Sequence, residues 1–336
     1  MIASVAENPV RVGITGLGSY APERVLTNGD LESMVDTTDE WITTRTGIKE
    51  RRIAAPEQAA SDLALPAARQ ALGEAGVTAE ELDLVVVATA TPDMLFPATA
   101  ALLADELGAS RAAAYDLLAG CTGFVYALAQ AYGALATGLS HRALVVGTET
   151  LSKITNWHDR GTCILFGDGA GAAVLQPVAR DGISGFELGA DGSGGLDLCI
   201  PAGGSRRPVT AEALAEEAQY IRMNGAEVFR FATRIMVTSA EELLAACGAT
   251  VADVDLYVPH QANKRIIDHA VKHLGLDTDK VVLNIDRYGN TSSASIPIGL
   301  AEAQAAGRLR PGTRVLMSAV GAGLTWGSVY MTWTEG

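Results

Sequence analysis

The sequence is short of positive charge and has no long hydrophobic run. Its 336 residues hold 25 Lys and Arg against 39 Asp and Glu, for a net charge of −14. Because contacts to nucleic-acid phosphates need clustered cations, this balance argues against a nucleic-acid-binding protein. It still allows a local basic patch for an acidic partner. No uninterrupted apolar stretch reaches the roughly 18 residues of a membrane-spanning helix, so no membrane partner is expected.

Cysteine is scarce as well. The four cysteines, with no CxxC pair and no neighbouring histidine at metal-ligand spacing, are Cys121, Cys163, Cys199 and Cys247. We therefore expect neither a disulfide framework nor a metal site. The first residues also lack the charged start and apolar run of a secretory signal. Together these absences predict a cytoplasmic protein with reduced thiols.

Strand-like and helix-like segments alternate along the chain. Short β-branched runs typical of buried strands occupy 82–90, 143–149 and 313–320. Alanine-rich helical patterns occupy 61–76, 125–138 and 227–248. Such alternation predicts an α/β fold with largely parallel strand pairing.

The sequence also contains an internal repeat. Segment 77–89 resembles 249–261 at an offset of 249 − 77 = 172, and 120–138 resembles 289–307 at 289 − 120 = 169. The order and spacing are kept, which indicates two related halves sharing one site. The predicted halves are 1–178 and 179–336.

Three residues in turns are candidates for chemistry. Cys121 follows a strand-like segment and a glycine and precedes a long apolar helix, where the helix dipole favours a thiolate. His260 follows the strand-like YVP, before a helix carrying Asn263, and Asn290 lies in another glycine turn. Each residue alone also fits a structural role, as an inert buried cysteine, a structural histidine or a common Gly-Asn turn. Because equivalent loops of two related halves meet at one axis, the three together suggest thiol-based acyl transfer.

Three glycine-rich segments have different interpretations. GAGLTWG (321–327) fits either an oxyanion hole of backbone N–H groups or a sharp turn between core strands. LFGDGAGAAVL (165–175) lacks the residues of a phosphate-binding loop and is interpreted as a bend in the core. Residues 192–208 are expected to form a surface excursion.

At this point the motifs match a known family. The chain resembles the β-ketoacyl-acyl-carrier-protein synthase III family, condensing enzymes that start type II fatty acid synthesis. Matching segments run nearly end to end and include DTTDEWITTRTGIKERR (36–52), AGCTGFVYAL (119–128), VPHQANKRIIDHA (258–270) and YGNTSSASIP (288–297). The resemblance implies a thiolase-like α-β-α-β-α layered fold of two pseudo-symmetric halves.

The resemblance also implies a mechanism. Cys121 would take an acyl group from a short acyl-CoA, and malonyl-acyl carrier protein would then lose CO₂. His260 and Asn290 would stabilise the enolate, and the backbone N–H groups of Cys121 and Ala322 would hold the oxyanion. No cofactor is implied, because the coenzyme A thioester is a substrate.

Further site residues follow from the same resemblance. Those implied for coenzyme A binding are Trp41, Arg45, Arg160 and Asn263. Those implied for the acyl pocket are Phe96, which would close the pocket of the partner in a homodimer, Leu151, Leu165, Met223 and Val320. Those implied for docking of the acidic carrier protein are Arg230, Arg234, Lys264, Arg265 and Lys272. The chain departs from the family at two positions, with Val320 where relatives often carry Phe and Ala322 in place of a frequent Gly.

The sequence leaves other functions open. A polyketide-pathway starter condensing enzyme, or an acyltransferase of the same fold, would carry the same residues. A hydrolase with a papain-like Cys-His-Asn triad would need an imidazolium–thiolate pair and a path for water. A non-catalytic scaffold would tolerate loss of Cys121. The length and branching of the acyl primer are not evident from the sequence.

Overall fold

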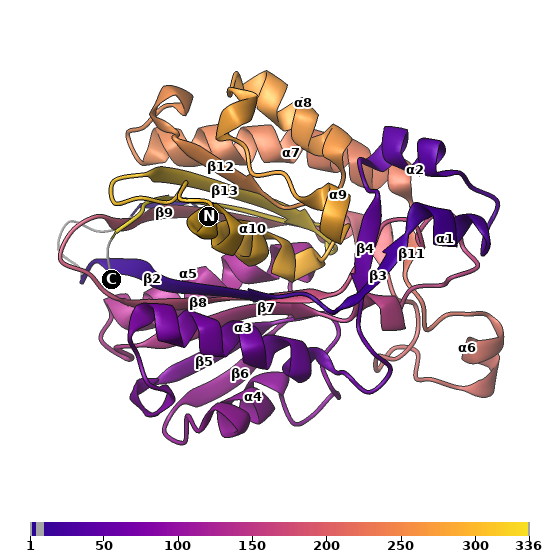
Figure 1. The fold of residues 1–336 in the computed structure, drawn as a ribbon, viewed down its shortest axis with the longest axis horizontal. Helices are drawn as coiled ribbons and strands as arrows, with labels where there is room; N and C mark the ends of the chain where they lie inside the picture. The colour runs from indigo at the N-terminus through magenta and orange to yellow at the C-terminus, as the bar shows by residue number, and fades with distance from the viewer. Residues whose placement is uncertain (1, 5–9, 335–336) are drawn as a thin grey trace.

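The computed structural model describes residues 2–4 and 10–334. Five layers lie on top of one another, and Figure 1 shows them from α7 and α8 at the top to α3 and α4 at the bottom. Two sheets form the second and fourth layers, and helices α5 and α10 lie between them. The predicted layered α/β fold is confirmed.

The strands have the following bounds. The first sheet has the order β2 (Val12–Tyr20), β8 (Gly169–Pro177), β7 (Ala143–Glu149), β5 (Leu84–Ala88) and β6 (Ala113–Leu117). The second has the order β1 (Ile2–Ser4), β9 (Gly182–Ala190), β14 (Thr325–Thr332), β13 (Arg314–Gly321) and β12 (Leu256–Pro259). Two small sheets pair β3 (Arg24–Thr27) with β4 (Glu50–Ile53) and β10 (Leu198–Cys199) with β11 (Arg222–Met223).

The two large sheets share one pairing pattern. In the first, β2–β8 and β8–β7 are antiparallel, and β7–β5 and β5–β6 are parallel. In the second, β9–β14 and β14–β13 are antiparallel and β13–β12 is parallel, and a parallel bridge from Tyr257 to Val281 occupies the place of β6. The repeat seen in the sequence is thus a repeat of strand order. The boundary at residue 178 stays a prediction; it falls between β8 and β9, while β1 crosses over to pair with β9.

The helices have the following bounds. They are α1 (Asn28–Glu32), α2 (Asp39–Thr46), α3 (Ala60–Ala75), α4 (Thr99–Leu107), α5 (Gly123–Ala136), α6 (Ala211–Ala215), α7 (Gly225–Ala246), α8 (Lys264–Leu274), α9 (Ile285–Tyr288) and α10 (Ser295–Ala305). The predicted helices and strands agree with these elements to within about three residues, which is the usual precision of boundaries predicted from sequence. Within residues 10–334, no helix has both the length and the hydrophobicity needed to cross a bilayer.

Small residues let α3 lie directly on the first sheet. A Cβ at Gly18 would come within 2.1 Å of the Ala67 carbonyl oxygen, and one at Gly16 within 2.2 Å of that of Ala71. The facing side of α3 is built from alanines, so helix and strand backbones come into close contact. Close packing of this kind gives many dispersion contacts per residue.

The interpretation of residues 165–175 as a bend was wrong for most of the segment. From Gly169 onward it is β8, a central strand hydrogen-bonded to β2 on one side and β7 on the other. Its glycines serve close packing, because a Cβ at Gly171 would lie 2.7 Å from the backbone nitrogen of Ile298 in α10. Only the residues before Gly169 turn.

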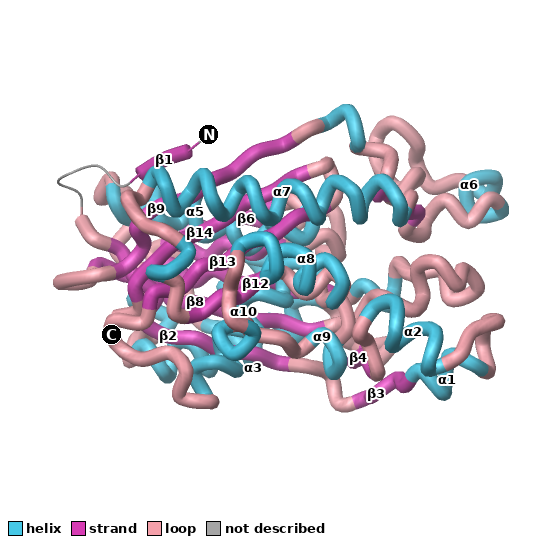
Figure 2. Tube along the Cα trace, turned by 90° about the horizontal axis from the view of Figure 1, so that it is seen from above, coloured by secondary structure: helices cyan, strands magenta, loops and turns pink. Residues whose placement is uncertain are grey.

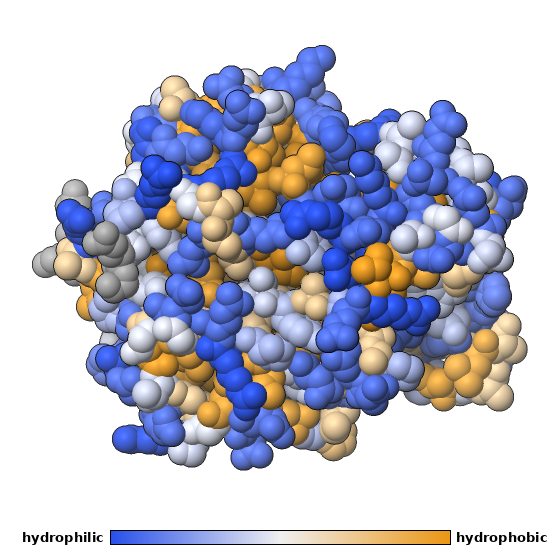
Figure 3. All heavy atoms as spheres, in the orientation of Figure 1, coloured by the Kyte–Doolittle hydropathy of each residue, from blue (hydrophilic) through white to orange (hydrophobic). Residues whose placement is uncertain are grey.

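Peripheral segments extend from one end of the layers. Figure 2 shows α1, α2, β3 and β4 there, together with the segment that carries α6. The predicted surface excursion at 192–208 is confirmed, since Ala202 is its one buried residue. Around α6, Val209 and Leu214 are exposed, and Figure 3 shows hydrophobic surface at this end of the molecule.

Candidate active site

Cys121 lies in a tight turn between β6 and α5. The turn Gly120–Thr122 is a single 3₁₀ turn, and Gly120 has a φ of 54°, which glycine adopts without strain. A Cβ at Gly120 would also lie 3.1 Å from the backbone nitrogen of Ala322. The nucleophile turn therefore packs against the turn between β13 and β14, as the oxyanion-hole interpretation of 321–327 requires.

His260 follows the last residue of β12 and is buried, with 1% of its surface exposed. Its Nδ1 lies 2.6 Å from the Ser295 hydroxyl oxygen at the start of α10. This contact fixes the ring and leaves Nε2 for the cavity. Asn263, expected within the next helix, instead caps it, because its side-chain oxygen accepts a hydrogen bond from the N–H of Arg265.

Asn290 is held on both sides by backbone. Its N–H donates to the Leu165 carbonyl over 2.8 Å, and its own carbonyl accepts from the N–H of Gly167 over 3.0 Å. Its side-chain oxygen accepts a hydrogen bond from the N–H of Ser292 over 2.9 Å. Since that oxygen is occupied, the amide NH₂ is the group left to face a ligand.

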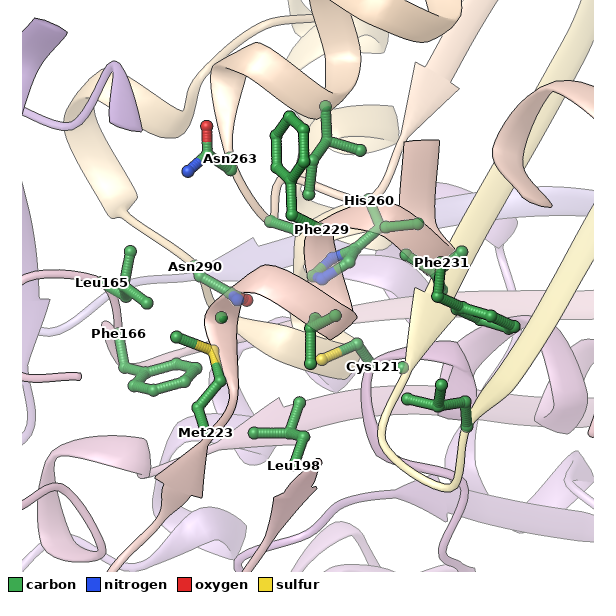
Figure 4. A pocket seen from close by; sticks show the side chains of 18 residues that line it. Cys121, Leu165, Phe166, Leu198, Met223, Phe229, Phe231, His260, Asn263 and Asn290 are labelled. Carbon is green, nitrogen blue, oxygen red and sulfur yellow. The ribbon is translucent and has the colours of Figure 1, made fainter. Parts of the chain in front are cut away.

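One cavity of about 90 Å³ brings the three residues together. Figure 4 shows the side chains of Cys121, His260 and Asn290 directed into it from three different segments of the chain. Its wall is mostly apolar and includes Leu165, Met223 and Val320, three of the residues predicted for an acyl pocket. A thiol, an imidazole and a carboxamide in one apolar cavity fit thiol-dependent acyl transfer.

The other predicted acyl-pocket residues lie elsewhere. Leu151 lines a second cavity of about 600 Å³, which Cys121 and Ala322 also line. Phe96 lines neither cavity, and 84% of its surface is exposed. Cys121 thus stands between a small cavity that contains His260 and Asn290 and a larger one lined mainly by apolar side chains.

Electrostatics keep the thiol and the imidazole neutral. Burial raises the pKa of the Cys121 thiol to about 11, and the charge of Glu149 acts in the same direction. Burial also lowers the pKa of His260 to about 3. This contradicts the expectation that the helix start favours a thiolate in the enzyme without substrate, since burial is the largest influence on the pKa of the thiol and raises it. At neutral pH the site holds a thiol beside an uncharged imidazole.

The residues predicted for coenzyme A lie around a surface cleft. Trp41, Arg45 and Asn263 line it, and the cleft shares Leu165 and Met223 with the cavity of Cys121. The guanidinium groups of Arg45 and Arg160 lie 5.0 and 5.2 Å from the centre of the Trp41 ring. The cleft at Trp41 therefore adjoins the cavity that contains Cys121.

The residues predicted for carrier docking are only partly gathered. Arg230 and Arg265 line the same cleft, and Arg265 lies 5.1 Å from the centre of the Phe229 ring. Arg230 and Lys264 pair with acidic neighbours of their own helices, Glu227 and Asp268. The remaining two, Arg234 and Lys272, are exposed and line none of these cavities.

Sequence reasoning missed three residues of the site. Ser295 contacts His260, Ser292 holds Asn290 through its N–H, and Glu149 is a fully buried acid at the end of β7. Ser292 has a φ of 48°, an unusual value for a residue other than glycine and one often found at functional sites. The serine-rich segment after Asn290, and an acid ending an apolar strand, were the available signals.

Comparisons with known proteins identify the family of this chain. The family described as 3-oxoacyl-[acyl-carrier-protein] synthase III matches residues 115–192, and its C-terminal region matches residues 244–333. The β-ketoacyl-[acyl-carrier-protein] synthase III of Symbiobacterium thermophilum is 59% identical over 96% of this chain and 98% of its own length. That of Desulfitobacterium hafniense is 58% identical over 97% and 99%.

Solved structures show the same relationship. The synthase III of Thermus thermophilus superposes with a TM-score of 0.90 at 50% identity, over 96% of this chain and 100% of that one. The priming β-ketosynthase of the R1128 polyketide pathway superposes with a TM-score of 0.91 at 38% identity, over 98% and 99%. The fold and the thiol site thus define a condensing acyltransferase. The chain belongs to the 3-oxoacyl-[acyl-carrier-protein] synthase III family.

Proposed function

We propose that this chain condenses a short acyl-CoA with malonyl-acyl carrier protein and so begins type II fatty acid synthesis. The convergence of Cys121, His260 and Asn290 on one cavity is the observation that carries the proposal. Curated relatives at 58–59% identity bear the name of this activity. The product is a β-ketoacyl-acyl carrier protein.

In the first half-reaction Cys121 becomes acylated. Its sulfur attacks the thioester carbonyl, a new C–S bond forms, and the coenzyme A thiolate leaves. The backbone N–H groups of Cys121 and Ala322 stabilise the tetrahedral oxyanion, since the turns that carry them are in contact. A soft sulfur suits the step because it is both a good nucleophile and, later, a good leaving group.

In the second half-reaction malonyl-acyl carrier protein loses CO₂. The electrons of the breaking C–C bond move into an enolate, which Nε2–H of His260 and the amide NH₂ of Asn290 stabilise by hydrogen bonds. The enolate carbon then attacks the acyl group on Cys121, and the Cys121 thiolate leaves. Two uncharged donors suit this role, and the low pKa of His260 agrees with a neutral ring.

The test of the proposed function is product analysis. Incubation with labelled acetyl-CoA and malonyl-acyl carrier protein is expected to give labelled β-ketoacyl-acyl carrier protein and one CO₂ per condensation. Release of the free acid instead would point to the hydrolase alternative. That alternative needs an imidazolium–thiolate pair, which the shifts of both pKa values disfavour.

A polyketide starter enzyme is the second candidate. The likeness to the R1128 priming ketosynthase favours it, although the identity of 38% is below that of the curated relatives. Growth of a bacterium depleted of its own synthase III, with this chain supplied, would support fatty acid initiation. A screen of acyl-CoA primers of increasing length and branching would identify the primer.

We expect Trp41→Ala to raise the KM for acyl-CoA about tenfold and to leave kcat nearly unchanged. A base stacked on an aromatic ring contributes roughly 1–3 kcal/mol, and loss of binding common to ground and transition state changes KM alone. Steady-state kinetics with varied acetyl-CoA measure the effect. Trp41→Phe keeps an aromatic face and serves as the control, with a smaller rise. An unchanged KM in Trp41→Ala would exclude Trp41 from coenzyme A binding.

We expect Arg265→Glu to raise the KM for malonyl-acyl carrier protein by about tenfold and the KM for acyl-CoA much less. The side chain lies at the cleft and is exposed, so reversing its charge repels an acidic partner without disturbing the core. The effect should shrink at high salt. Arg310→Glu, an equal charge reversal at an exposed turn before β13, is the control. An equal rise of the KM for malonyl-acyl carrier protein in Arg265→Glu and Arg310→Glu would contradict docking of the carrier protein at Arg265.

The remaining proposals concern assembly and location. A homodimer is supported by exposed apolar side chains near the edge strand β6, among them Leu95, Phe96 and Leu118. Sedimentation of the purified protein tests it. Cytoplasmic location is supported by the four cysteines, each of which is free. No resident cofactor is proposed, because the thiol, the side-chain donors and the backbone N–H groups supply every step.

A further inference from the structure

One arginine is fully buried behind the turn that carries Asn290. Arg51 lies in β4, is 0% exposed, and takes part in no ion pair among residues 10–334. Burial lowers the pKa of Arg51 to about 10, so the guanidinium still carries its charge near neutral pH. A buried charge without a counter-charge is costly, and an apolar side chain of similar size would avoid that cost. What the guanidinium adds is its hydrogen bonds.

The guanidinium joins two segments that are far apart in the chain. Nη1 donates to the Leu26 carbonyl over 3.2 Å and to Oδ1 of Asn28 over 2.9 Å. Nη2 donates to the Ile164 carbonyl over 2.7 Å. Among the described residues Nε has no partner. The planar fork of an arginine fixes such acceptors relative to one another, which the single ammonium group of a lysine cannot do in the same way.

The segment 164–167 also holds Asn290. The N–H of Asn290 donates to the Leu165 carbonyl over 2.8 Å, directly after the carbonyl that Arg51 holds. The N–H of Gly167 donates to the Asn290 carbonyl over 3.0 Å, and the two segments form a short parallel bridge. The backbone of Asn290 therefore takes its position from a segment that Arg51 fixes at its start.

The base of the Arg51 side chain packs against the same bridge. A Cβ at Gly167 would lie 3.0 Å from the Cβ of Arg51, and a Cβ at Gly289 would lie 3.3 Å from it. Gly289 has a φ of 65° and immediately precedes Asn290. The two glycines thus leave room for Arg51 to lie against both sides of the bridge that holds Asn290.

Asn28 fixes the other end of the guanidinium. It is 1% exposed, and its amide NH₂ donates to Oδ1 of Asp39 over 2.8 Å and to the Ile48 carbonyl over 2.7 Å. With the NH₂ so engaged, Oδ1 is the atom left to accept from Arg51. Asp39 begins α2, which forms part of the cleft predicted for coenzyme A. One buried guanidinium is thus hydrogen-bonded to supports of both that cleft and Asn290.

We propose that Arg51 is a positioning residue for Asn290, because it holds the segment that places the carboxamide at the cavity. The proposal rests on the proposed function, in which the amide NH₂ of Asn290 stabilises the enolate. A donor contributes most when it is in place before charge develops, so a small displacement of the amide weakens it sharply. Loss of the fork should therefore slow the second half-reaction. It should spare acylation of Cys121, whose turn packs instead against the turn between β13 and β14.

Hydrogen exchange tests the positioning without any substrate. In Arg51→Lys, which keeps the charge but loses the fork, we expect the backbone N–H groups of Gly167 and Asn290 to exchange at least about tenfold faster than in the wild type. The exchange of β12 reports global stability and should stay unchanged. Arg52→Lys is the matched control, since Arg52 is the next residue of β4 and pairs with Glu50. Unchanged exchange at Asn290, or an equal increase in β12, would overturn the proposal.

The two half-reactions give the functional readout. Arg51→Lys is expected to release CO₂ from malonyl-acyl carrier protein about 10–100-fold more slowly than the wild type, and to form the acyl adduct on Cys121 within about twofold of the wild-type rate. CO₂ release at the wild-type rate would mean that the charge suffices without the fork, and this result overturns the proposal. An equal loss of both half-reactions would indicate a general effect on the fold and would overturn it as well.

A double-mutant cycle asks whether Arg51 acts through Asn290. In the Asn290→Ala background, Arg51→Lys is expected to cause no further loss of CO₂ release, because the amide that Arg51 positions is already gone. Two losses that multiply would show that Arg51 acts independently of Asn290, which contradicts the proposal.

These measurements separate the positioning of Asn290 from the proposed function. If the wild type released no CO₂ from malonyl-acyl carrier protein, the proposed function would fail, and hydrogen exchange at Asn290 would decide the role of Arg51. Should Arg51→Lys fail to fold, Arg51→Met fills the space with an apolar side chain and buries no charge. It should show the same faster exchange and the same split between the half-reactions. Wild-type exchange and CO₂ release in folded Arg51→Met would equally overturn the proposal.

Discussion

Cys121→Ala is expected to abolish labelling of the protein by acetyl-CoA, with a loss of at least about 10⁴-fold in condensation. The small side chain leaves the turn intact, because Gly120 rather than Cys121 carries its unusual φ. Mass spectrometry of the intact protein after incubation with acetyl-CoA measures the acyl adduct. The loss should be the largest of any single substitution, since no other nucleophile lines the cavity that holds His260 and Asn290.

Cys247→Ala is the matched control for this experiment. Cys247 is a half-buried thiol at the end of α7 and lines neither of the two cavities beside Cys121. The Cys247→Ala variant should be labelled by acetyl-CoA on Cys121 at the wild-type rate. An acyl adduct that persists in Cys121→Ala would contradict the assignment of the nucleophile, and labelling lost in both variants would point to a general effect on folding.

His260→Ala and Asn290→Ala are each expected to retain acylation and to lose decarboxylation by about 10²–10³-fold. Removing one donor to a developing oxyanion typically costs about 2.7–4 kcal/mol of barrier. Release of labelled CO₂ from malonyl-acyl carrier protein measures the second half-reaction, and the acyl adduct measures the first. The two donors come from different elements, so each variant leaves the other donor held by its own contacts.

A different effect of these substitutions on the two half-reactions would require a different mechanism. If His260→Ala slowed acylation as much as decarboxylation, His260 would also be the base that takes the proton of the Cys121 thiol. Because removal of a buried histidine takes one of two partners from the Ser295 hydroxyl and leaves a cavity, thermal melting of each variant should accompany the kinetics. Asn290→Asp, which keeps the size but removes the NH₂, is the control for geometry.

The placement of the three central residues followed from the sequence because each stands directly after a strand or a glycine turn. The repeat then brought the turns of Cys121 and Asn290 to equivalent positions, which the shared strand pairing explains. Motif resemblance added Trp41 and its two arginines, and the structure places the three together. For these residues, local sequence pattern and motif spacing were sufficient to predict where they lie.

The other features of the site depend on contacts between residues far apart in the chain, which no local sequence pattern predicts. Glu149 meets Ser293 across 144 positions of chain, and Ser295 meets His260 across 35. The prediction that Cys121 is a thiolate was wrong because it was based on the helix that follows the residue and left out the burial of the sulfur, which raises the pKa of the thiol. The glycines of β8 were misinterpreted for a related reason, since they accommodate a helix from the other half of the chain and not a turn of their own.

The repeat of strand order has a consequence for how such a site arises. Equivalent turns present a thiol in one half and a carboxamide in the other, and the chemistry needs both at once. Two identical copies of either half would bring together two thiols or two amides, and neither pair both holds an acyl group and stabilises an enolate. The site therefore depends on the difference between the two turns, one of which carries the thiol and the other the carboxamide.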